Sequence, residues 1–252
     1  MDGTVKDSLK KVLFFHHTGQ ISGATRSLSY ILKGIDRNNY NISLVNIREG
    51  PANDIFRKIG IEPVVLKGSG PFHGSTVVDM NWKIVLKNLD KFIPTIYNSY
   101  QSIKDLTPDL IHLNSTCLFP IAIAAKLYNT KLPVTIHVRE PLRKSWHGVP
   151  LRYFSKKYGD GFIAISDFDL NSLKISEEDK FTSEVIYNFV DRSFSKKKKN
   201  KNLRKELGID NDDIVFLYLA RFAESNGWKE LLNYADQVIQ KRPNCHFILA
   251  GA

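Results

Sequence analysis

Short apolar runs alternate along the chain with longer stretches in which hydrophobic residues recur at helical spacing. The runs predict strands at Val12–Phe15, Ile42–Ile47, Pro63–Leu66, Asp109–Leu113, Pro133–Val138, Gly161–Ile165 and Glu184–Tyr187. The stretches between them predict helices at Gly23–Ile35, Ala52–Ile59, Asp79–Leu106, Leu118–Tyr128, Pro150–Tyr158 and Asp167–Leu173. Such repeated alternation is typical of an α/β fold with a doubly wound, parallel sheet. We expect Pro94 to break or kink the longest helix, because proline lacks the N–H that the helix uses.

The pattern is interrupted after Tyr187 by a polar, charged stretch that includes Lys196–Lys199. This stretch predicts an interdomain linker with a short helix at Leu203–Leu207. A second βα pattern then begins, with strands at Ile214–Ala220 and His246–Ala250 around one helix. The sequence thus predicts a domain at 1–190, a linker at 191–213 and a second domain at 214–252. Two strands and one helix are too few to bury a core, so we expect this second Rossmann-like domain to be incomplete and the chain to be a fragment.

A glycine-bearing turn joins the first predicted strand to the first predicted helix, with Gly19 and Gly23 at its two ends. The N–H groups at the start of a helix and the helix dipole both favour an anion at such a place. Glycine has no Cβ, so a phosphate or a sugar can come close to the backbone there. The alternative is a tight strand-to-helix turn that binds no ligand.

Polar residues follow the predicted strands, where ligands of open parallel sheets bind. They are His16, His17, Thr18 and Gly19; His112, Asn114 and Ser115; His137, Arg139 and Glu140; Ser166 and Asp167; Asn188 and Asp191; and Arg221. A single histidine at a strand end is more often a structural hydrogen-bonding group than a catalyst. The clustering is the stronger signal, and we expect His16, His137 and the Gly19–Gly23 turn to share one edge of the sheet.

The composition narrows the choice of compartment and partners. Cys117 and Cys245 are too few for a disulfide scaffold or a metal cluster, which favours a reducing, cytoplasmic location. The net charge of +10 favours anionic partners such as phosphorylated small molecules, acidic lipid or nucleic acid. No aromatic residues interleave Lys196–Lys199, so we expect no specific nucleic-acid binding.

The stretch Trp82–Lys91 mixes large apolar side chains with Lys83, Lys87 and Lys91. On a helix, this mixture predicts weak peripheral contact with acidic lipid at the inner face of a membrane. The alternative is an ordinary amphipathic helix on the protein surface.

Two family resemblances compete. Thr18-Gly19-x-x-x-Gly23 and the pair Tyr153 and Lys157 resemble short-chain dehydrogenases, which are NAD(P)-dependent oxidoreductases. However, Ala24 and Thr25 stand where that family has a third glycine, and a second βα domain is foreign to it.

The other resemblance covers nearly the whole chain and is to retaining glycosyltransferases of the GT-B fold. The residues that carry it, in order, are Gly19-x-x-x-Gly23-Ala24-x-Arg26-Ser27-Leu28, Pro108–His112, Thr135–His137, Ile163–Ser166, Asn188–Asp191, Arg204-x-x-Leu207-Gly208, and Ala220-Arg221 with Gly227 and Leu231-Leu232. This resemblance implies transfer of a sugar from a nucleotide sugar to a glycan or lipid-linked acceptor, as in cell-envelope or polysaccharide synthesis. It implies no metal and no cofactor besides the donor substrate.

The resemblance also implies a role for each matching residue. Gly19 and Gly23 would approach the donor diphosphate or the reacting sugar, and His137 would lie beside the transferred sugar as the catalytic residue. Arg221 would hold the diphosphate. Arg139 and Glu140 would contact acceptor or sugar, and a buried ion pair between these two is the alternative.

Two departures from the family pattern predict a chain with little activity of its own. Asn226 stands where the family has a lysine, and an amide brings no charge to a diphosphate. The family's Glu-x7-Glu segment would lie beyond Ala252. We therefore expect slow or no turnover by this chain alone, and a non-catalytic subunit that binds an acceptor or a partner is the alternative.

Overall fold

The computed structural model describes residues 9–176, 179–190, 203–222 and 226–251. The chain divides into two compact units, Met1–Phe189 and Val190–Ala252, and each is described here by itself. The lysine run Lys196–Lys199 and Asp191 lie outside the described residues.

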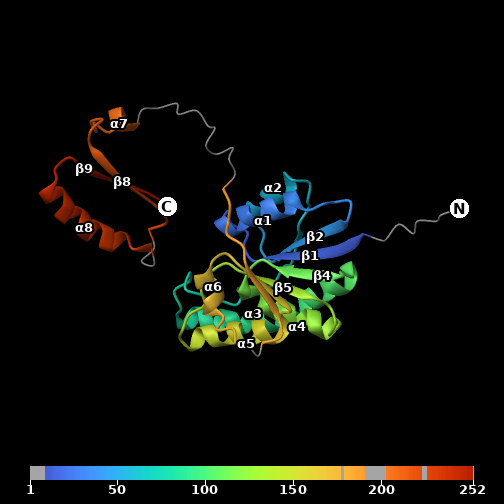
Figure 1. The fold of residues 1–252 in the computed structure, drawn as a ribbon. Coiled ribbons are helices and arrows are strands. Elements are labelled where there is room, and N and C mark those ends of the chain that lie inside the picture. The colour runs from blue at the N-terminus through green and yellow to red at the C-terminus, as the bar shows by residue number, and fades with distance from the viewer. Residues whose placement is uncertain (1–8, 177–178, 191–202, 223–225, 252) are drawn as a thin grey trace. The chain divides into compact units, whose positions relative to one another are not determined.

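The first unit is built on one parallel sheet of seven strands (Figure 1). The strands are β1 (Lys10–His16), β2 (Tyr40–Asn46), β3 (Val64–Val65), β4 (Leu110–Leu113), β5 (Val134–Val138), β6 (Gly161–Ala164) and β7 (Thr182–Val185). Their order is β3-β2-β1-β4-β5-β6-β7, so the direction of winding switches between β1 and β4. The prediction of a doubly wound, parallel sheet is confirmed.

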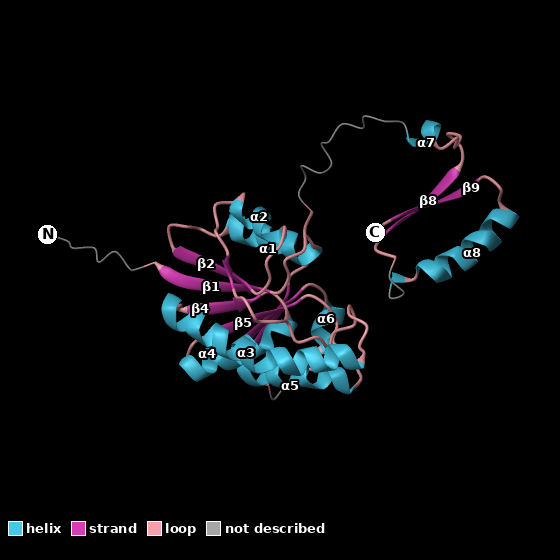
Figure 2. Ribbon diagram, turned by 180° about the vertical axis from the view of Figure 1, so that it is seen from behind, coloured by secondary structure: helices cyan, strands magenta, loops and turns pink. Residues whose placement is uncertain are grey.

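Helices cover both faces of this sheet (Figure 2). One face carries α1 (Gly23–Gly34) and α2 (Ala52–Arg57), and the other carries α3 (Trp82–Leu106), α4 (Phe119–Tyr128) and α5 (Val149–Tyr158). The shorter elements are η1 (Thr116–Leu118), η2 (Trp146–Gly148) and α6 (Asp167–Ser172). The helix pairs α3–α4 and α4–α5 pack side by side.

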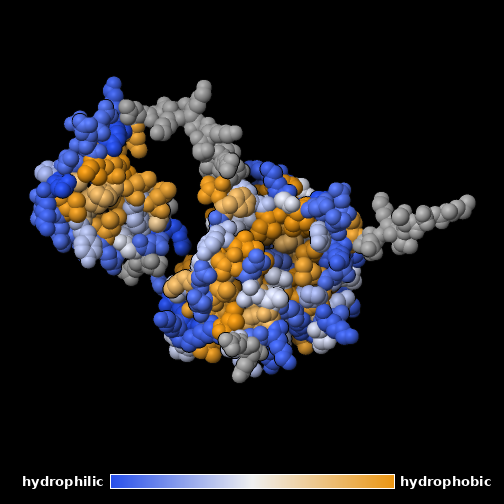
Figure 3. All heavy atoms as spheres, viewed as in Figure 1, coloured by the Kyte–Doolittle hydropathy of each residue, from blue (hydrophilic) through white to orange (hydrophobic). Residues whose placement is uncertain are grey.

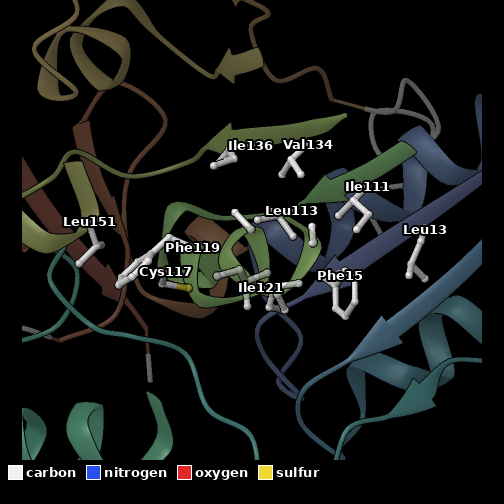
Figure 4. Packing of buried hydrophobic residues seen from close by; sticks show 14 of the residues in the cluster. Leu13, Phe15, Ile111, Leu113, Cys117, Phe119, Ile121, Val134, Ile136 and Leu151 are labelled. Carbon is white, nitrogen blue, oxygen red and sulfur yellow. The ribbon is translucent and has the colours of Figure 1, made fainter. Parts of the chain in front are cut away.

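Alternating side chains of β1 supply both hydrophobic cores, because successive residues of a strand point to opposite faces. Leu13 and Phe15 belong to the larger core, which Figure 4 shows together with Phe119 of α4. Val12 and Phe14 belong to the smaller core beneath α1 and α2. A strand buried on both faces explains why the run Val12–Phe15 is wholly apolar.

Of the expectation that Pro94 breaks or kinks the longest helix, the break is wrong and the kink stays a prediction. Helix α3 runs without interruption from Trp82 to Leu106, and it begins after an Asn81 cap rather than at Asp79. Polar contacts on both sides of Pro94 hold the helix in place: Thr95 accepts from the N–H of Gly70 at 2.9 Å, and Asn88 accepts from the N–H of His73 at 2.9 Å. The tertiary contacts therefore outweigh the local cost of the proline.

The second unit contains α7 (Leu203–Glu206), β8 (Ile214–Leu219), α8 (Trp228–Lys241) and β9 (Cys245–Ala250). Strands β8 and β9 form a two-stranded parallel sheet. Few of its described side chains are buried; these include Ile209, Ala235 and Cys245. Figure 3 shows hydrophobic residues gathered at the surface over β8 and β9, where Leu217 and Leu219 are exposed.

Candidate functional site

The carboxyl ends of β1, β4 and β5 lie side by side at the point where the sheet changes its direction of winding. In doubly wound sheets this position is the usual place of a ligand site. The polar residues at these three strand ends are His16, Asn114, Ser115, His137, Arg139 and Glu140. Hydrogen bonds join His16, Asn114, Arg139 and His137 in one group and Ser115 with Glu140 in another, so this edge is the candidate site.

A run of four hydrogen bonds connects β5 with the turn before α1. Arg139 Nε donates to Asn114 Oδ1 at 2.8 Å, and Asn114 Nδ2 lies 2.9 Å from His16 Nδ1. His16 Nε2 lies 3.1 Å from Thr25 Oγ1, and the Thr25 hydroxyl donates to the carbonyl oxygen of Gln20 at 2.8 Å. The side chains of Arg139, Asn114, His16 and Thr25 are all buried. We call these four residues the strand-end network.

The chemistry of the groups fixes the direction of each of these hydrogen bonds. A guanidinium only donates, so Asn114 presents its oxygen to Arg139 and its amide nitrogen to His16. Neutral His16 then accepts at Nδ1 and donates from Nε2 to Thr25. Burial, followed by the nearby His17 and Arg139, holds the pKa of His16 well below its ordinary value, which keeps the ring neutral. The strand-end network therefore has one hydrogen-bonding pattern at neutral pH.

His137, the predicted catalytic residue, is buried beside the strand-end network. Its Nδ1 lies 3.2 Å from Arg139 Nη2, which can only donate, so the proton of the neutral ring is on Nε2. Burial, then Arg139 and His112, lower the pKa of His137 to about 2. The ring is therefore neutral at neutral pH, and its Nε2–H can donate a hydrogen bond to a ligand. Its Nε2 is covered from solvent and has no hydrogen-bond partner among the described residues.

The sequence left open a buried ion pair between Arg139 and Glu140. Within the described structure, these two side chains form no direct ion pair with each other. Glu140 instead accepts a hydrogen bond from the Ser115 hydroxyl at 2.9 Å. Burial raises the pKa of Glu140, against the effects of Ser115 and Arg139. Burial also lowers the pKa of Arg139 to about 10, partly offset by Glu140, so the guanidinium stays charged at neutral pH.

The two glycines of the turn have different surroundings. A Cβ on Gly19 would lie 2.0 Å from the carbonyl oxygen of Glu49, and the carbonyl oxygen of Gly19 accepts from the N–H of Ala52 at 2.8 Å. Gly19 is thus required by backbone packing against the loop before α2, whereas the sequence suggested ligand approach. A Cβ on Gly23 would meet nothing within 4 Å, so the first turn of α1 is open there.

Helix α1 begins with a capping box. The hydroxyl of Ser22 accepts from the N–H of Thr25 at 3.2 Å, and the Thr25 side chain in turn accepts from the N–H of Ser22. Thr25 therefore serves both the helix cap and the strand-end network, which ties the position of the helix N-terminus to β4 and β5. The first turn of α1 holds no acidic residue that would repel an anion.

Arg221 and Asn226 lie together at the end of β8 in the second unit. The Asn226 amide donates to the carbonyl oxygen of Arg221 at 2.8 Å, and the Tyr218 hydroxyl donates to the same oxygen at 3.2 Å. Asn226 therefore holds the backbone at Arg221 through its neutral amide. A lysine at this position would bring a positive charge there instead.

The sequence placed His16 and Asn114 at strand ends but assigned neither of them a role, and it did not place Thr25 at the site. Asn114 and His16 carried a signal, since each follows a strand, but nothing in the sequence shows which strand-end residues contact each other. Thr25 carried no signal beyond its position early in a helix. No group of three or more His, Cys, Asp or Glu side chains in the described residues could hold a metal ion, and a metal-free site remains a prediction.

The pair Tyr153 and Lys157 lies outside the candidate site. Tyr153 is exposed on α5, and the Lys157 ammonium lies 5.6 Å from the centre of its ring. Since α5 covers a face of the sheet rather than the strand-end edge, the described structure gives no support to the dehydrogenase alternative (Figure 2).

Comparisons with known proteins agree with this architecture. The sequence model of Glycosyltransferase Family 4 matches residues 21–194, which is more than half of the chain. No curated protein matches the chain.

Several solved structures share the fold. Anabaena HepE in complex with UDP and glucose is 20% identical, with a TM-score of 0.62 over 95% of this chain and 60% of its own. A putative UDP-N-acetylglucosamine 2-epimerase from Listeria monocytogenes is 14% identical, with a TM-score of 0.62 over 96% of this chain and 62% of its own. Sucrose-phosphate synthase from Thermosynechococcus elongatus is 12% identical, with a TM-score of 0.60 over 96% and 62%. The chain thus spans about 60% of the length of these proteins.

Proposed function

The chain belongs to glycosyltransferase family 4, and from this premise we propose that its strand-end site takes part in sugar transfer from a nucleotide sugar to an acceptor. We propose a UDP-sugar as the donor, because HepE is described in complex with UDP and glucose, and other proteins of similar fold act on UDP-linked sugars by name. The donor is then a substrate, and we propose no further cofactor.

The observation that carries this proposal is the joining of the α1 N-terminus to a buried, charged Arg139 through Asn114 and His16. A helix N-terminus and a guanidinium both favour an anionic ligand. Gly23 leaves the first turn of α1 open to such a ligand. We propose that this edge binds the donor diphosphate or the sugar that is attached to it.

We propose that His137 positions the transferred sugar, with its Nε2–H donating to a sugar oxygen or its backbone lying beside the reacting carbon. A buried N–H without a partner is costly, so a ligand oxygen that reached it would be held well. Because Nε2 is covered from solvent, this contact requires a neighbouring group to move when the ligand binds. We assign Arg139 and Glu140 to the sugar or the acceptor.

Arg221 is our candidate for the positive charge that stabilises the leaving diphosphate. Asn226 adds no charge and is engaged with the Arg221 backbone. We therefore propose that turnover by this chain is slow, and this observation also favours the second candidate function, a subunit that binds without transferring. Retention of configuration and a glycan or lipid-linked acceptor of the cell envelope are proposals that rest on the family resemblance.

Calorimetric titration of the whole chain with UDP and UDP-glucose tests this function. Loss of one charged contact to a phosphate corresponds to roughly a hundredfold in binding or rate. We expect Arg221→Ala to weaken UDP binding by that order and Arg242→Ala, which removes a charge at the end of α8, to have little effect. If neither UDP nor any other nucleoside diphosphate binds, or if both variants behave alike, the assignment of Arg221 is wrong.

A transfer assay separates the two candidate functions. Sugar release or transfer that disappears in Arg221→Ala identifies an enzyme. Tight binding of the nucleotide sugar with no release over a long incubation identifies the binding subunit.

A further inference from the structure

Helix α3 exposes apolar side chains along one face. They are Trp82, Leu86, Leu89, Ile93 and Tyr97, and each is more than half exposed. Spacings of three and four residues place all five on one face of a helix. We call this set the α3 stripe. From Trp82 to Tyr97 it extends about 22 Å along the helix axis.

The opposite face of α3 is fixed to the protein by polar contacts. Asn88 donates to the carbonyl oxygen of His73 at 2.7 Å, and Thr95 donates to that of Gly70 at 3.2 Å. Asn88, Thr95 and Ser99 are buried. A surface helix ordinarily buries its apolar face and exposes its polar one, and α3 reverses part of this pattern. Since rotation of the helix would break these bonds, the α3 stripe stays exposed to solvent.

A second group of exposed apolar residues lies beside the N-terminal half of α3. These are Trp146, Val149 and Tyr153 on η2 and α5. A hollow of about 170 Å³ joins the two groups, and its lining includes Leu89 and Trp146 together with Phe72 and Pro150. The α3 stripe and Trp146 therefore form one apolar surface through this hollow, and Val149 and Tyr153 expose further apolar side chains on the same helix α5.

Cationic side chains accompany this apolar surface. Lys83, Lys87 and Lys144 are exposed. None of the ion pairs found among the described residues includes any of these three lysines. The Lys83 ammonium lies 5.8 Å from the ring centre of Trp82. The carboxylates close by are already paired: Asp90 lies 2.9 Å from Lys91, and Asp79 lies 3.6 Å from Arg143. The unpaired charge next to the apolar surface is therefore positive.

We propose that this surface docks the chain onto a lipid bilayer that contains anionic lipids. Tryptophan and tyrosine suit the boundary between headgroups and acyl chains, and lysines beside them attract acidic headgroups. No helix in the described part of the chain is long and apolar enough to cross a bilayer. Helix α3 lies along the bilayer surface, with the α3 stripe turned toward the acyl chains.

Vesicle flotation with the full chain tests the proposal. The vesicles are phosphatidylcholine with or without phosphatidylglycerol, each at low and at high salt. We expect recovery with the anionic vesicles at low salt, and much less with neutral vesicles or at high salt. Lys83→Gln with Lys87→Gln should reduce partitioning by about fivefold for each lysine. Lys33→Gln with Lys58→Gln removes the same charge from α1 and from the residue that follows α2, on the other face of the sheet, and should change partitioning little.

Leu86→Gln, Leu89→Gln and Ile93→Gln together should abolish vesicle binding without unfolding the chain, since glutamine favours helix and these positions are exposed. Circular dichroism of the triple variant checks the fold. Equal recovery with neutral and anionic vesicles overturns the proposal, as does an equal effect of the two lysine pairs. Self-association that the triple variant removes, in a chain that binds no vesicles, identifies a second copy as the occupant instead.

Discussion

Replacing Asn114 tests whether the strand-end network holds the first unit together. The Asn114 side chain makes three hydrogen bonds: to Arg139 Nε at 2.8 Å, to His16 Nδ1 at 2.9 Å and to the carbonyl oxygen of Ala24 at 3.3 Å. Asn114→Leu removes all three and keeps the same branched side-chain skeleton, although its methyl groups are somewhat larger. The Nε–H of the buried Arg139 guanidinium then has no acceptor, and His16 Nδ1, which is itself an acceptor, has no donor.

The cost follows from the kinds of bond that are lost. A hydrogen bond to a charged group contributes about 2 kcal/mol and a neutral one about 1 kcal/mol, with a further penalty for buried groups left unpaired. The added apolar burial of leucine offsets about 1 kcal/mol. We expect a net loss of about 3 kcal/mol, a large share of the roughly 5–15 kcal/mol that stabilises a typical domain.

Hydrogen exchange read by peptide mass spectrometry measures this loss in each unit separately. Protection of β1, β4 and β5 should fall in Asn114→Leu, while that of β8 and β9 should not change. Asn98→Leu is the control, because Asn98 bonds to Lys67 and Ser69 near the surface and should cost about 1 kcal/mol. If Asn114→Leu costs no more than this control, Arg139 and His16 do not depend on Asn114.

Asn114→Asp tests the direction of the hydrogen bonds rather than their sum. An aspartate still accepts from Arg139 but places a second acceptor opposite His16 Nδ1. His16 must then carry a proton on Nδ1, either by changing tautomer or by becoming charged. The ¹⁵N NMR signals of His16 should show an Nε2–H tautomer in the parent chain and a protonated Nδ1 in the variant; an unchanged spectrum contradicts the assigned pattern.

Two further predictions concern pH and the glycine turn. Burial lowers the pKa of His112 to about 3 and of His137 to about 2, so below their ordinary value of 6.5 the unfolded chain binds protons that the folded chain does not. The free energy of unfolding should therefore be full above that pH and fall as the pH decreases, by up to about 1.4 kcal/mol per pH unit for each histidine. Urea unfolding at a series of pH values measures it, and in His112→Phe it should depend less steeply on pH. Gly19→Ala should destabilise the first unit by about 1–3 kcal/mol through its clash with Glu49, whereas Gly23→Ala should be neutral or stabilising by thermal unfolding and weaken nucleotide binding; equal stability of the two variants would refute this distinction.

The sequence predicted the sheet well because its signals are local. Buried parallel strands need continuous apolar runs, and Val12–Phe15 and the run ending at Val138 match β1 and β5 closely. The predicted helix break at Pro94 is wrong, because the contacts of Asn88 and Thr95 with the loop before α3 are tertiary and leave no local signal in the sequence. The roles given to Arg139 and Glu140 stay predictions, and only their ion pair is contradicted.

The site itself was harder to predict, since contact between strand ends depends on side-chain geometry. The glycine turn illustrates this: Gly19 and Gly23 look alike in the sequence, yet one packs against the Glu49 backbone and the other faces open space. Sequence spacing identifies a turn, but only the neighbouring loop shows why glycine is needed at each position.

The placement of Arg139 is the physical basis of the anion that we propose at this edge. Its guanidinium is buried and remains charged, with a pKa of about 10, but its described hydrogen bonds go to neutral groups, Asn114 and His137. A buried charge without a directly bonded counterion is costly, and a bound anion reduces that cost. Because the strand-end network also fixes the N-terminus of α1, the two groups that attract an anion are held in one fixed arrangement. Such preorganisation is what electrostatic stabilisation of a phosphate requires.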